Sequence, residues 1–257
     1  MKILMSGTYT ITFGDQAENH VGMQKIGSLS NHGYNLSDLI NIRNYLSDRN
    51  IKSDIFDLNY VLEKLDIQPD DEAYILVIHN GVNELINKTA SSDIFEELKN
   101  LSWDNKALMY GRVVNKNARH NLCFGDISQK PNYEKGRGTI INFKLVPVLK
   151  ILKEKIYKIT GDNLVAEGNY YYDINKCGIG YHGDSERRKV IGVRIGKTIP
   201  LVYQWYYQSK PIGEPIIFEL GDGDIYIMSE KATGNDWKYK NKYTLRHAAG
   251  CSKYTNL

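Results

Sequence analysis

The sequence has few cysteines, few prolines and no long apolar run. Its three cysteines are odd in number and lack CxxC spacing, which argues against a disulfide framework and favours reduced thiols. No stretch approaches the ~18 consecutive apolar residues that suggest a membrane-spanning helix. The first ten residues turn polar too soon for a secretory signal. We therefore expect a cytoplasmic or otherwise intracellular protein that does not associate with a membrane.

Internal repeats and low-complexity tracts are also absent, and 257 residues are enough for one large domain with a smaller unit beside it. Charge is unevenly distributed, although the net charge is only +3. Residues 1–105 contain eight Lys/Arg and sixteen Asp/Glu, whereas residues 106–160 contain twelve and three. The boundary between these segments is the best candidate for a domain boundary. The basic segment would bind phosphates, or its lysines would solvate the outer face of a helix.

Residues 1–105 have the pattern of a small α/β unit. Short apolar runs predict strands at 1–7, 51–58 and 73–78, and apolar spacing predicts helices at 36–50 and 93–101. The polar segment 13–35 predicts an ordered loop, and its two histidines, His20 and His32, are expected at the surface or in hydrogen bonds rather than on a metal. No function for this unit follows from its sequence.

Residues 106–257 predict one helix followed by a series of strands. Pro147 suits the first position of a helix and Gly161 suits its end, and apolar residues recur at helical spacing between them. From residue 164 onward, six or seven short β-branched and aromatic runs are separated by Gly, Pro or Asp. Such closely spaced strands suggest a β-sandwich or jelly roll.

His182-Gly183-Asp184 and the later His247 form the most informative pattern in the sequence. Two neutral imidazoles and one carboxylate can occupy one face of an octahedral Fe(II), leaving three positions for a co-substrate and O₂. In an extended chain His182 and Asp184 point to the same side, because side chains repeat every second residue. A His-x-Asp pair alone also arises by chance, so its interpretation depends on the neighbouring segments.

From about residue 110 to the end, motifs in a fixed order resemble the AlkB-like branch of the Fe(II)/2-oxoglutarate dioxygenases. These motifs are Arg119 with Phe124-Gly125-Asp126, then Asn169-Tyr170-Tyr171, then GYHGDSE, and finally GDGDIYIMS before the distal histidine. The resemblance implies an α+β protein with a double-stranded β-helix (jelly-roll) oxygenase core at 106–257. The small α/β unit at 1–105 has no identified counterpart in that family.

The resemblance also implies the residues that hold the iron and the co-substrate. His182, Asp184 and His247 would bind Fe(II). Asn169 and Tyr171 would hydrogen-bond a carboxylate of the co-substrate 2-oxoglutarate.

The sequence departs from the AlkB-like pattern in two places. If the spacing after DIYIMS were that of close relatives, the distal ligand would fall near Tyr239. An insertion at 233–243 accounts for the longer spacing to His247. AlkB-like proteins also place two arginines after the distal histidine, where this chain has none. Because a buried carboxylate needs a cationic partner, we expect Lys253 to bind the far carboxylate of 2-oxoglutarate, with Arg194 as the alternative.

By resemblance, the expected reaction is hydroxylation of an N-alkyl group on a nucleic acid base, with release of formaldehyde, succinate and CO₂. The candidate substrate-binding residues are Arg119, Phe124, Tyr133 and Glu186, and single-stranded or modified nucleic acid is the expected partner. One alternative is a 2-oxoglutarate-dependent hydroxylase of a protein side chain or small molecule. Another is a non-catalytic jelly-roll binding module that has lost its iron site.

Overall fold

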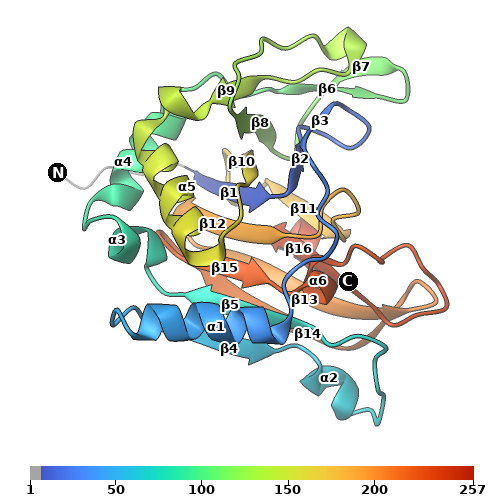
Figure 1. Cartoon of the computed structure of the whole chain (residues 1–257). Coiled ribbons are helices and arrows are strands. Elements are labelled where there is room, and N and C mark those ends of the chain that lie inside the picture. Colours follow the sequence, from blue (N-terminus) through green and yellow to red (C-terminus); the bar gives the residue numbers. More distant parts are fainter. Residues whose placement is uncertain (1–6) are drawn as a thin grey trace.

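The structure, a computed structural model that describes residues 7–257, has a mixed α+β architecture built on two β-sheets (Figure 1). The larger sheet has eight strands in the order β4-β5-β15-β12-β1-β10-β8-β9, and only β8 and β9 pair in parallel. Its strands are β1 (Thr8–Gly14), β4 (Ser53–Asp57), β5 (Tyr74–Ile78), β8 (His120–Gly125), β9 (Ile140–Asn142), β10 (Val165–Tyr171), β12 (Val190–Gly196) and β15 (Ile225–Met228). The expected strand at 1–7 lies outside the described residues, apart from Gly7.

The smaller sheet has four strands, and it is hydrogen-bonded separately from the larger one, so the two do not close into a barrel. Its order is β11 (Gly178–His182), β16 (Thr244–Gly250), β13 (Ile199–Tyr207) and β14 (Lys210–Leu220). Two hairpins complete the β structure: β2 (Gln16–Glu18) with β3 (Lys25–Gly27), and β6 (Lys106–Met109) with β7 (Arg112–Asn115). The first hairpin lies in segment 13–35, which was expected to be a loop. The sequence did not predict it because its two strands are too short to show the alternation of a strand.

Helices α1 (Leu36–Ser47), α4 (Ala90–Lys99) and α5 (Pro147–Thr160) cover one face of the larger sheet (Figure 1). The remaining helices are short: α2 (Tyr60–Glu63), α3 (Gly81–Leu85), α6 (Glu230–Thr233), α7 (Ser252–Thr255), and the 3₁₀ turns η1 (Tyr133–Lys135) and η2 (Phe143–Leu145). The prediction of α5 from its flanking residues is confirmed, since Pro147 is its first residue and Gly161 follows it with a φ of 76°. Within residues 7–257, no helix is long and apolar enough to cross a membrane.

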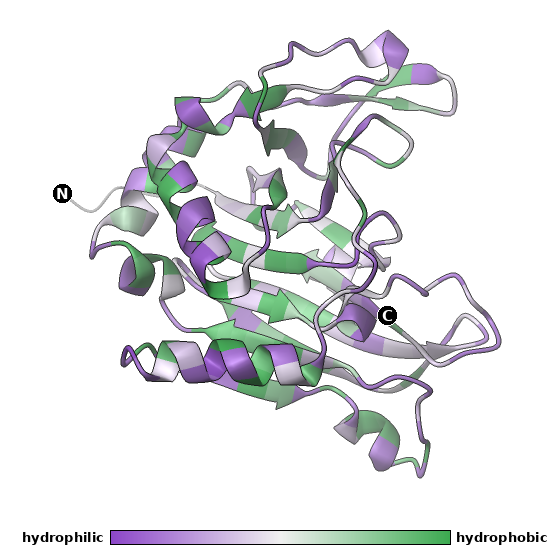
Figure 2. Cartoon of the chain, in the orientation of Figure 1, coloured by the Kyte–Doolittle hydropathy of each residue, from purple (hydrophilic) through white to green (hydrophobic). Residues whose placement is uncertain are grey.

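Strand β1 lies in the middle of the larger sheet, between β10 and β12, although it is the first strand described. Its sequence alternates threonine with apolar residues. Tyr9, Ile11 and Phe13 are buried with the helices, whereas Thr10 and Thr12 face the smaller sheet and line a cavity there. Figure 2 shows apolar residues concentrated along the central strands, while the loops at the right of the view are largely hydrophilic. The alternation therefore gives the sheet an apolar face and a more polar face.

The domain boundary expected at residue 105 would separate strands that belong to one sheet, the larger one. Strands β1, β4 and β5 come from the first 105 residues, and they are interleaved with β10, β12 and β15 from the later part of the chain. The two segments share one apolar core, which contains residues of α1, α4 and α5 together. The domain boundary itself stays a prediction.

The central position of β1 makes a prediction about stability. Ile11 is fully buried, so Ile11→Ala should lower the free energy of unfolding by about 2–5 kcal/mol, through lost burial and a cavity. Val21→Ala is the control, because Val21 is 81% exposed and its loss should change stability by less than about 0.5 kcal/mol. Urea denaturation of both variants measures the difference, and equal stabilities would contradict a central role for β1.

Candidate metal centre

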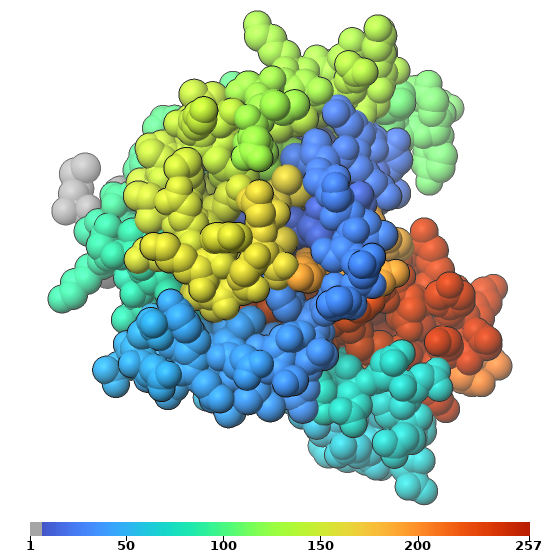
Figure 3. Space-filling view, viewed as in Figure 1, coloured from blue at the N-terminus to red at the C-terminus, as the bar shows by residue number. Residues whose placement is uncertain are grey.

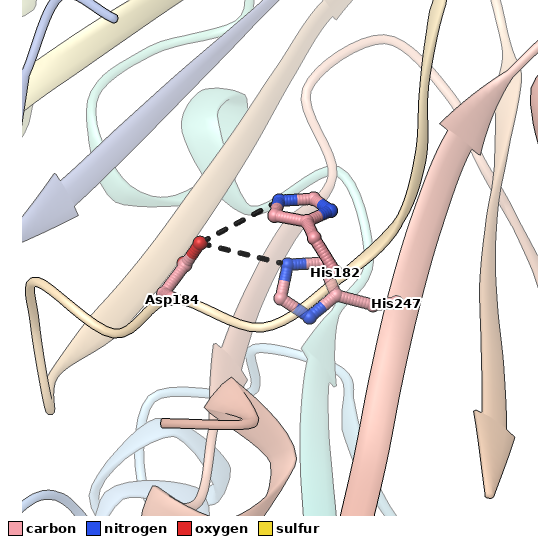
Figure 4. Close-up of side chains that lie close together, drawn as sticks. All are labelled: His182, Asp184 and His247. Atoms are coloured by element: carbon pink, nitrogen blue, oxygen red, sulfur yellow. Dashed lines mark ion pairs between the residues drawn. The ribbon is translucent and has the colours of Figure 1, made fainter. Parts of the chain in front are cut away.

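His182, Asp184 and His247 form a group that could hold a metal ion, with their ligand atoms all within 4.8 Å of one another (Figure 4). His182 is the last residue of β11, and its register partner on the neighbouring strand β16 is His247. Asp184 lies in the turn after β11. Its Oδ1 is 3.6 Å from Nε2 of His182 and 3.9 Å from Nε2 of His247. The structure therefore brings together the three residues that the sequence pattern predicted as ligands.

The two imidazoles are prepared to act as neutral ligands. Nδ1 of His182 is 2.8 Å from the carbonyl oxygen of Gly180, so this nitrogen is the donor and Nε2 keeps its lone pair for a metal. Burial lowers the pKa of His182 and lowers that of His247 well below its ordinary value. A metal ion would therefore displace few protons from these rings near neutral pH.

Asp184 lies beside a buried arginine, Arg187, which the sequence pattern did not indicate. Arg187, three residues further on, is 3% exposed, and its Nε lies 3.8 Å from Oδ2 of Asp184. Its Nη2 pairs with Glu167 at 2.5 Å and with Glu186 at 2.7 Å. Burial raises the pKa of Asp184 to about 7, against the opposing effect of Arg187. A bound cation would favour the charged carboxylate, so this donor set fits a divalent metal.

The turn that carries Asp184 is packed too tightly for any residue other than glycine at position 183. A Cβ there would lie 1.9 Å from the carbonyl oxygen of Gly234 and 2.7 Å from Cδ1 of Trp237. The backbone N–H of Asp184 also donates to the carbonyl oxygen of Thr233 at 2.9 Å. The end of α6 and the segment after it therefore fix the orientation of the His-Gly-Asp triplet.

An inner cavity of about 60 Å³ lies between the two sheets, against the three candidate ligands. One row of the larger sheet crosses it, because Thr10 of β1 pairs with Asn169 of β10 on one side and with Arg194 of β12 on the other. Tyr171 and Tyr226 also line this cavity. The predicted co-substrate residues Asn169, Tyr171 and Arg194 therefore lie on the same side of the sheet as the ligand group.

Two buried arginines line the inner cavity, and of these Arg187 is paired with carboxylates whereas Arg194 has no ion-pair partner among the described residues. Arg194 is 0% exposed, and its Nη1 donates to Oγ1 of Thr10. Its Nε and Nη2 have no hydrogen-bond partner among the described residues. A buried guanidinium without an anion is costly, so this wall of the cavity is suited to an anionic group. Asn169 is already satisfied within the protein, since its Oδ1 accepts from Arg119 at 2.6 Å and from Asn121 at 2.7 Å.

A second, outer cavity of about 390 Å³ lies on the other side of the ligand group. It is lined by the β2–β3 hairpin, by Arg119 and Glu186, and by Trp237 and Lys238. The two cavities share His182, Asp184 and Arg187, so the candidate ligands stand between them. Figure 3 shows the surface hollowed at the right of the view, between the green β6–β7 hairpin and the red segment near the C-terminus.

Three residues predicted for the site lie elsewhere. Lys253 is exposed in α7, where its Nζ lies 5.5 Å from the ring centroid of Tyr254, and it lines neither cavity. Phe124 is fully buried in the apolar core, and it is therefore inaccessible to a substrate. Tyr133 donates its hydroxyl to Asp104 at 2.8 Å and does not line either cavity.

No protein-family model matches the chain. A protein of Acanthamoeba polyphaga mimivirus is 57% identical to it over 248 residues, which cover 96% of this chain and 97% of the mimivirus protein. That protein is described as uncharacterized, so its description assigns no activity.

The tight turn at Gly183 makes a prediction about metal binding. Gly183→Ala should displace the segment at Gly234 and Trp237 and weaken Co(II) binding about 10- to 100-fold, as loss of supporting contacts does at metal sites. Gly180→Ala is the matched control, because Gly180 lies in the preceding strand β11 and a Cβ there meets no atom within 4 Å. Absorbance titration with Co(II) compares them. Equal affinities in the two variants would contradict this role for the turn.

Proposed function

The chain belongs to the same family as this mimivirus protein, and we propose that it is an Fe(II)- and 2-oxoglutarate-dependent dioxygenase of the AlkB-like kind. The observation that carries the proposal is the pairing of two features in one cavity: a two-histidine, one-carboxylate group and a buried arginine that lacks an anion. The first is the ligand set of non-haem Fe(II) oxygenases. The second suits the far carboxylate of a dicarboxylate co-substrate.

The arrangement of strands supports a jelly-roll interpretation with one rearrangement. Strands β15, β12, β1 and β10 face β11, β16 and β13 across the inner cavity. The AlkB-like family supplies its co-substrate arginines from a strand after the distal histidine. In this chain the position between β10 and β12 is occupied by β1 instead. We infer that β1 takes the place of that strand and that Arg194, supported by Thr10, takes the place of the missing arginine.

The protein's own residues then have distinct tasks. His182, Asp184 and His247 would hold Fe(II), and Arg187 lies 3.8 Å from Oδ2 of Asp184, where its charge favours the ionised carboxylate. Arg194 would bind the far carboxylate of 2-oxoglutarate, with Tyr171 and Asn169 beside it. Apolar residues in the cavity wall exclude water, and these are Ile179, Val190, Leu201 and Met228.

Bound Fe(II) would supply the redox chemistry, in which one oxygen atom of O₂ enters succinate with loss of CO₂ and the other enters the substrate. With an N-methyl group as substrate, the hydroxylated product breaks down to formaldehyde and the free amine. The outer cavity is the side from which such a substrate would approach, because it reaches the candidate ligands from outside. Hydroxylation of an N-alkyl group on a nucleic acid base is the reaction that we propose.

The first test is iron binding and turnover. Under anaerobic conditions the protein should bind about one Fe(II) per chain and form succinate from 2-oxoglutarate once O₂ is admitted. His182→Ala and Asp184→Ala should lose both properties, and Asp184→Glu should also fail because its longer arm misplaces the ligand oxygen. Iron-dependent succinate formation that persists in either alanine variant would contradict the assignment.

The second test compares the two candidate cations. Arg194→Lys and Arg194→Met should raise the half-saturating 2-oxoglutarate concentration, and the methionine variant by ~30-fold or more, because losing one partner of a buried charged pair costs about 2–5 kcal/mol. Lys253→Met should leave it unchanged, since Lys253 is exposed and lies outside the inner cavity. Steady-state succinate assays measure both values. The opposite result would return this role to Lys253.

A further inference from the structure

The side chain of Tyr226 lines the inner cavity, and its hydroxyl group is open to a ligand there. The residue is 4% exposed, and within residues 7–257 its hydroxyl makes no hydrogen bond. The hydroxyl of Tyr203 also lacks a partner, but it is sealed inside the packed interior, whereas that of Tyr226 is not. Because a buried hydroxyl without a partner is costly, the position of Tyr226 favours a bound ligand that accepts its hydrogen.

The absence of a side chain at Gly192 determines where this hydroxyl lies. Gly192 of β12 is the register partner of Tyr226 on β15. A Cβ at position 192 would lie 1.9 Å from Cζ of Tyr226 and 2.3 Å from its hydroxyl oxygen. The phenol therefore extends across the neighbouring strand and occupies the space of the missing side chain. Any larger residue at position 192 would displace it.

The hydroxyl of Tyr226 and the guanidinium of Arg194 lie on the same face of the larger sheet. Side chains two positions apart on one strand point to the same side, so the phenol that fills the space at Gly192 lies beside Arg194, two positions further along β12. Burial raises the pKa of Tyr226 to about 12, and the charge of Arg194 is the largest effect that opposes it. Tyr226 is therefore a hydrogen-bond donor at neutral pH, next to Nε and Nη2 of Arg194, which also lack partners among the described residues.

The remaining charged groups that line the inner cavity balance one another. They are Glu167, Asp184 and Arg187, and the two candidate histidine ligands beside them have a pKa that burial lowers. Arg187 pairs with Glu167 at 2.5 Å and lies 3.8 Å from Asp184, and a divalent metal on the candidate ligands would add positive charge beside Asp184. The positive charge of Arg194 thus has no counter-charge among the described residues, and the free donors around it select an anion.

The ring of Tyr226 also takes up space in the inner cavity. The remaining volume is about 60 Å³, and the smaller sheet contributes the apolar residues Ile179 and Leu201 to its wall. In a confined apolar pocket, one methylene group added to a ligand changes its binding by about 10- to 200-fold. The ring therefore limits the length of the ligand that the cavity accepts.

We propose that Tyr226 is a specificity-determining residue of the inner cavity. Its hydroxyl and the guanidinium of Arg194 together bind one carboxylate of a short dicarboxylate, and its ring limits the length of the carbon chain between that carboxylate and the candidate ligands. The inference rests on the proposed function for the identity of the ligand, 2-oxoglutarate. Tyr226 lies in GDGDIYIMS, which the sequence identified only as the strand before the distal histidine.

Calorimetric titration of the Co(II)-loaded protein with 2-oxoglutarate, under nitrogen, tests the role of the hydroxyl. Tyr226→Phe should weaken binding roughly 10- to 150-fold, which corresponds to the loss of one hydrogen bond to a charged group. Tyr203→Phe is the matched control, because it also removes a buried hydroxyl without a partner, and Tyr203 does not line the cavity. This control should bind as the wild-type protein does. Equal affinities in the two variants would overturn the proposal.

Length selectivity tests the role of the ring. The wild-type protein should bind 2-oxoglutarate about 10- to 200-fold more tightly than 2-oxoadipate, which is one methylene group longer. Tyr226→Phe should keep this preference because the ring remains, whereas Tyr226→Val should lose most of it. The same preference in Tyr226→Val as in the wild-type protein would show that the ring does not set the length of the ligand.

A double-mutant cycle tests the placement of the phenol over Gly192. Gly192→Ala should weaken 2-oxoglutarate binding when Tyr226 is present, because the added methyl group displaces the phenol. It should have little further effect in Tyr226→Val, where that space is empty. Additive losses would contradict the placement. If Gly192→Ala alone does not fold, as judged by thermal unfolding, the comparison of Tyr226→Phe with Tyr203→Phe still decides the proposal.

Butyrate separates this proposal from the proposed function, because it carries one carboxylate and has no group that chelates a metal. In the metal-free protein, butyrate should raise the melting temperature relative to chloride at equal ionic strength, and Tyr226→Phe should reduce this effect. That result without any iron-dependent succinate formation would remove the dioxygenase assignment and leave the carboxylate site intact. Succinate formation with an unchanged 2-oxoglutarate requirement in Tyr226→Phe would overturn the role of Tyr226 and leave the dioxygenase assignment.

Discussion

The pairing of β1 with both β10 and β12 is the constraint on which the fold and the candidate site depend together. The apolar side of β1 packs against the helices through Tyr9, Ile11 and Phe13. On its other side Thr10 stands between Asn169 and Arg194 in one row of the sheet. The same strand therefore closes the core and holds Arg194 in the wall of the inner cavity, and neither arrangement survives a shift of one residue in its register.

The sequence predicted the candidate ligands because their geometry follows from local rules. His182 ends a strand, Asp184 is two residues further on, and no histidine other than His247 follows them. Arg194 could also be identified, since an arginine in the middle of an apolar strand requires a partner. The predictions of α1, α4 and α5 succeeded for a similar reason. The spacing of apolar residues and the residues at the helix ends are local signals that can be read within one segment of the sequence.

The remaining features depend on which strands become neighbours, and a pattern within one segment does not contain that information. Lys253 was a reasonable partner for a carboxylate by its distance from His247, but β16 ends at Gly250 and the chain turns into a short exposed helix. Thr10 contacts Arg194 from 184 positions away in the sequence. The sequence identified the segment around Trp237 only as an insertion. It could not predict that Trp237 packs against Gly183, because the two residues lie far apart in the sequence.

The position of β1 also affects how the chain acquires its structure. Among the described strands β1 is made first, but its two neighbours are β10 and β12, so it has no partner until Tyr171 has been added and lacks the second until Gly196 has been added. Contacts separated by so many residues close large loops and slow folding. During synthesis the apolar side of β1 has only part of the helical layer to pack against. The centre of the larger sheet therefore cannot be completed before β12 has been made, and the threonine-rich side of β1 limits how much apolar surface is exposed in the meantime.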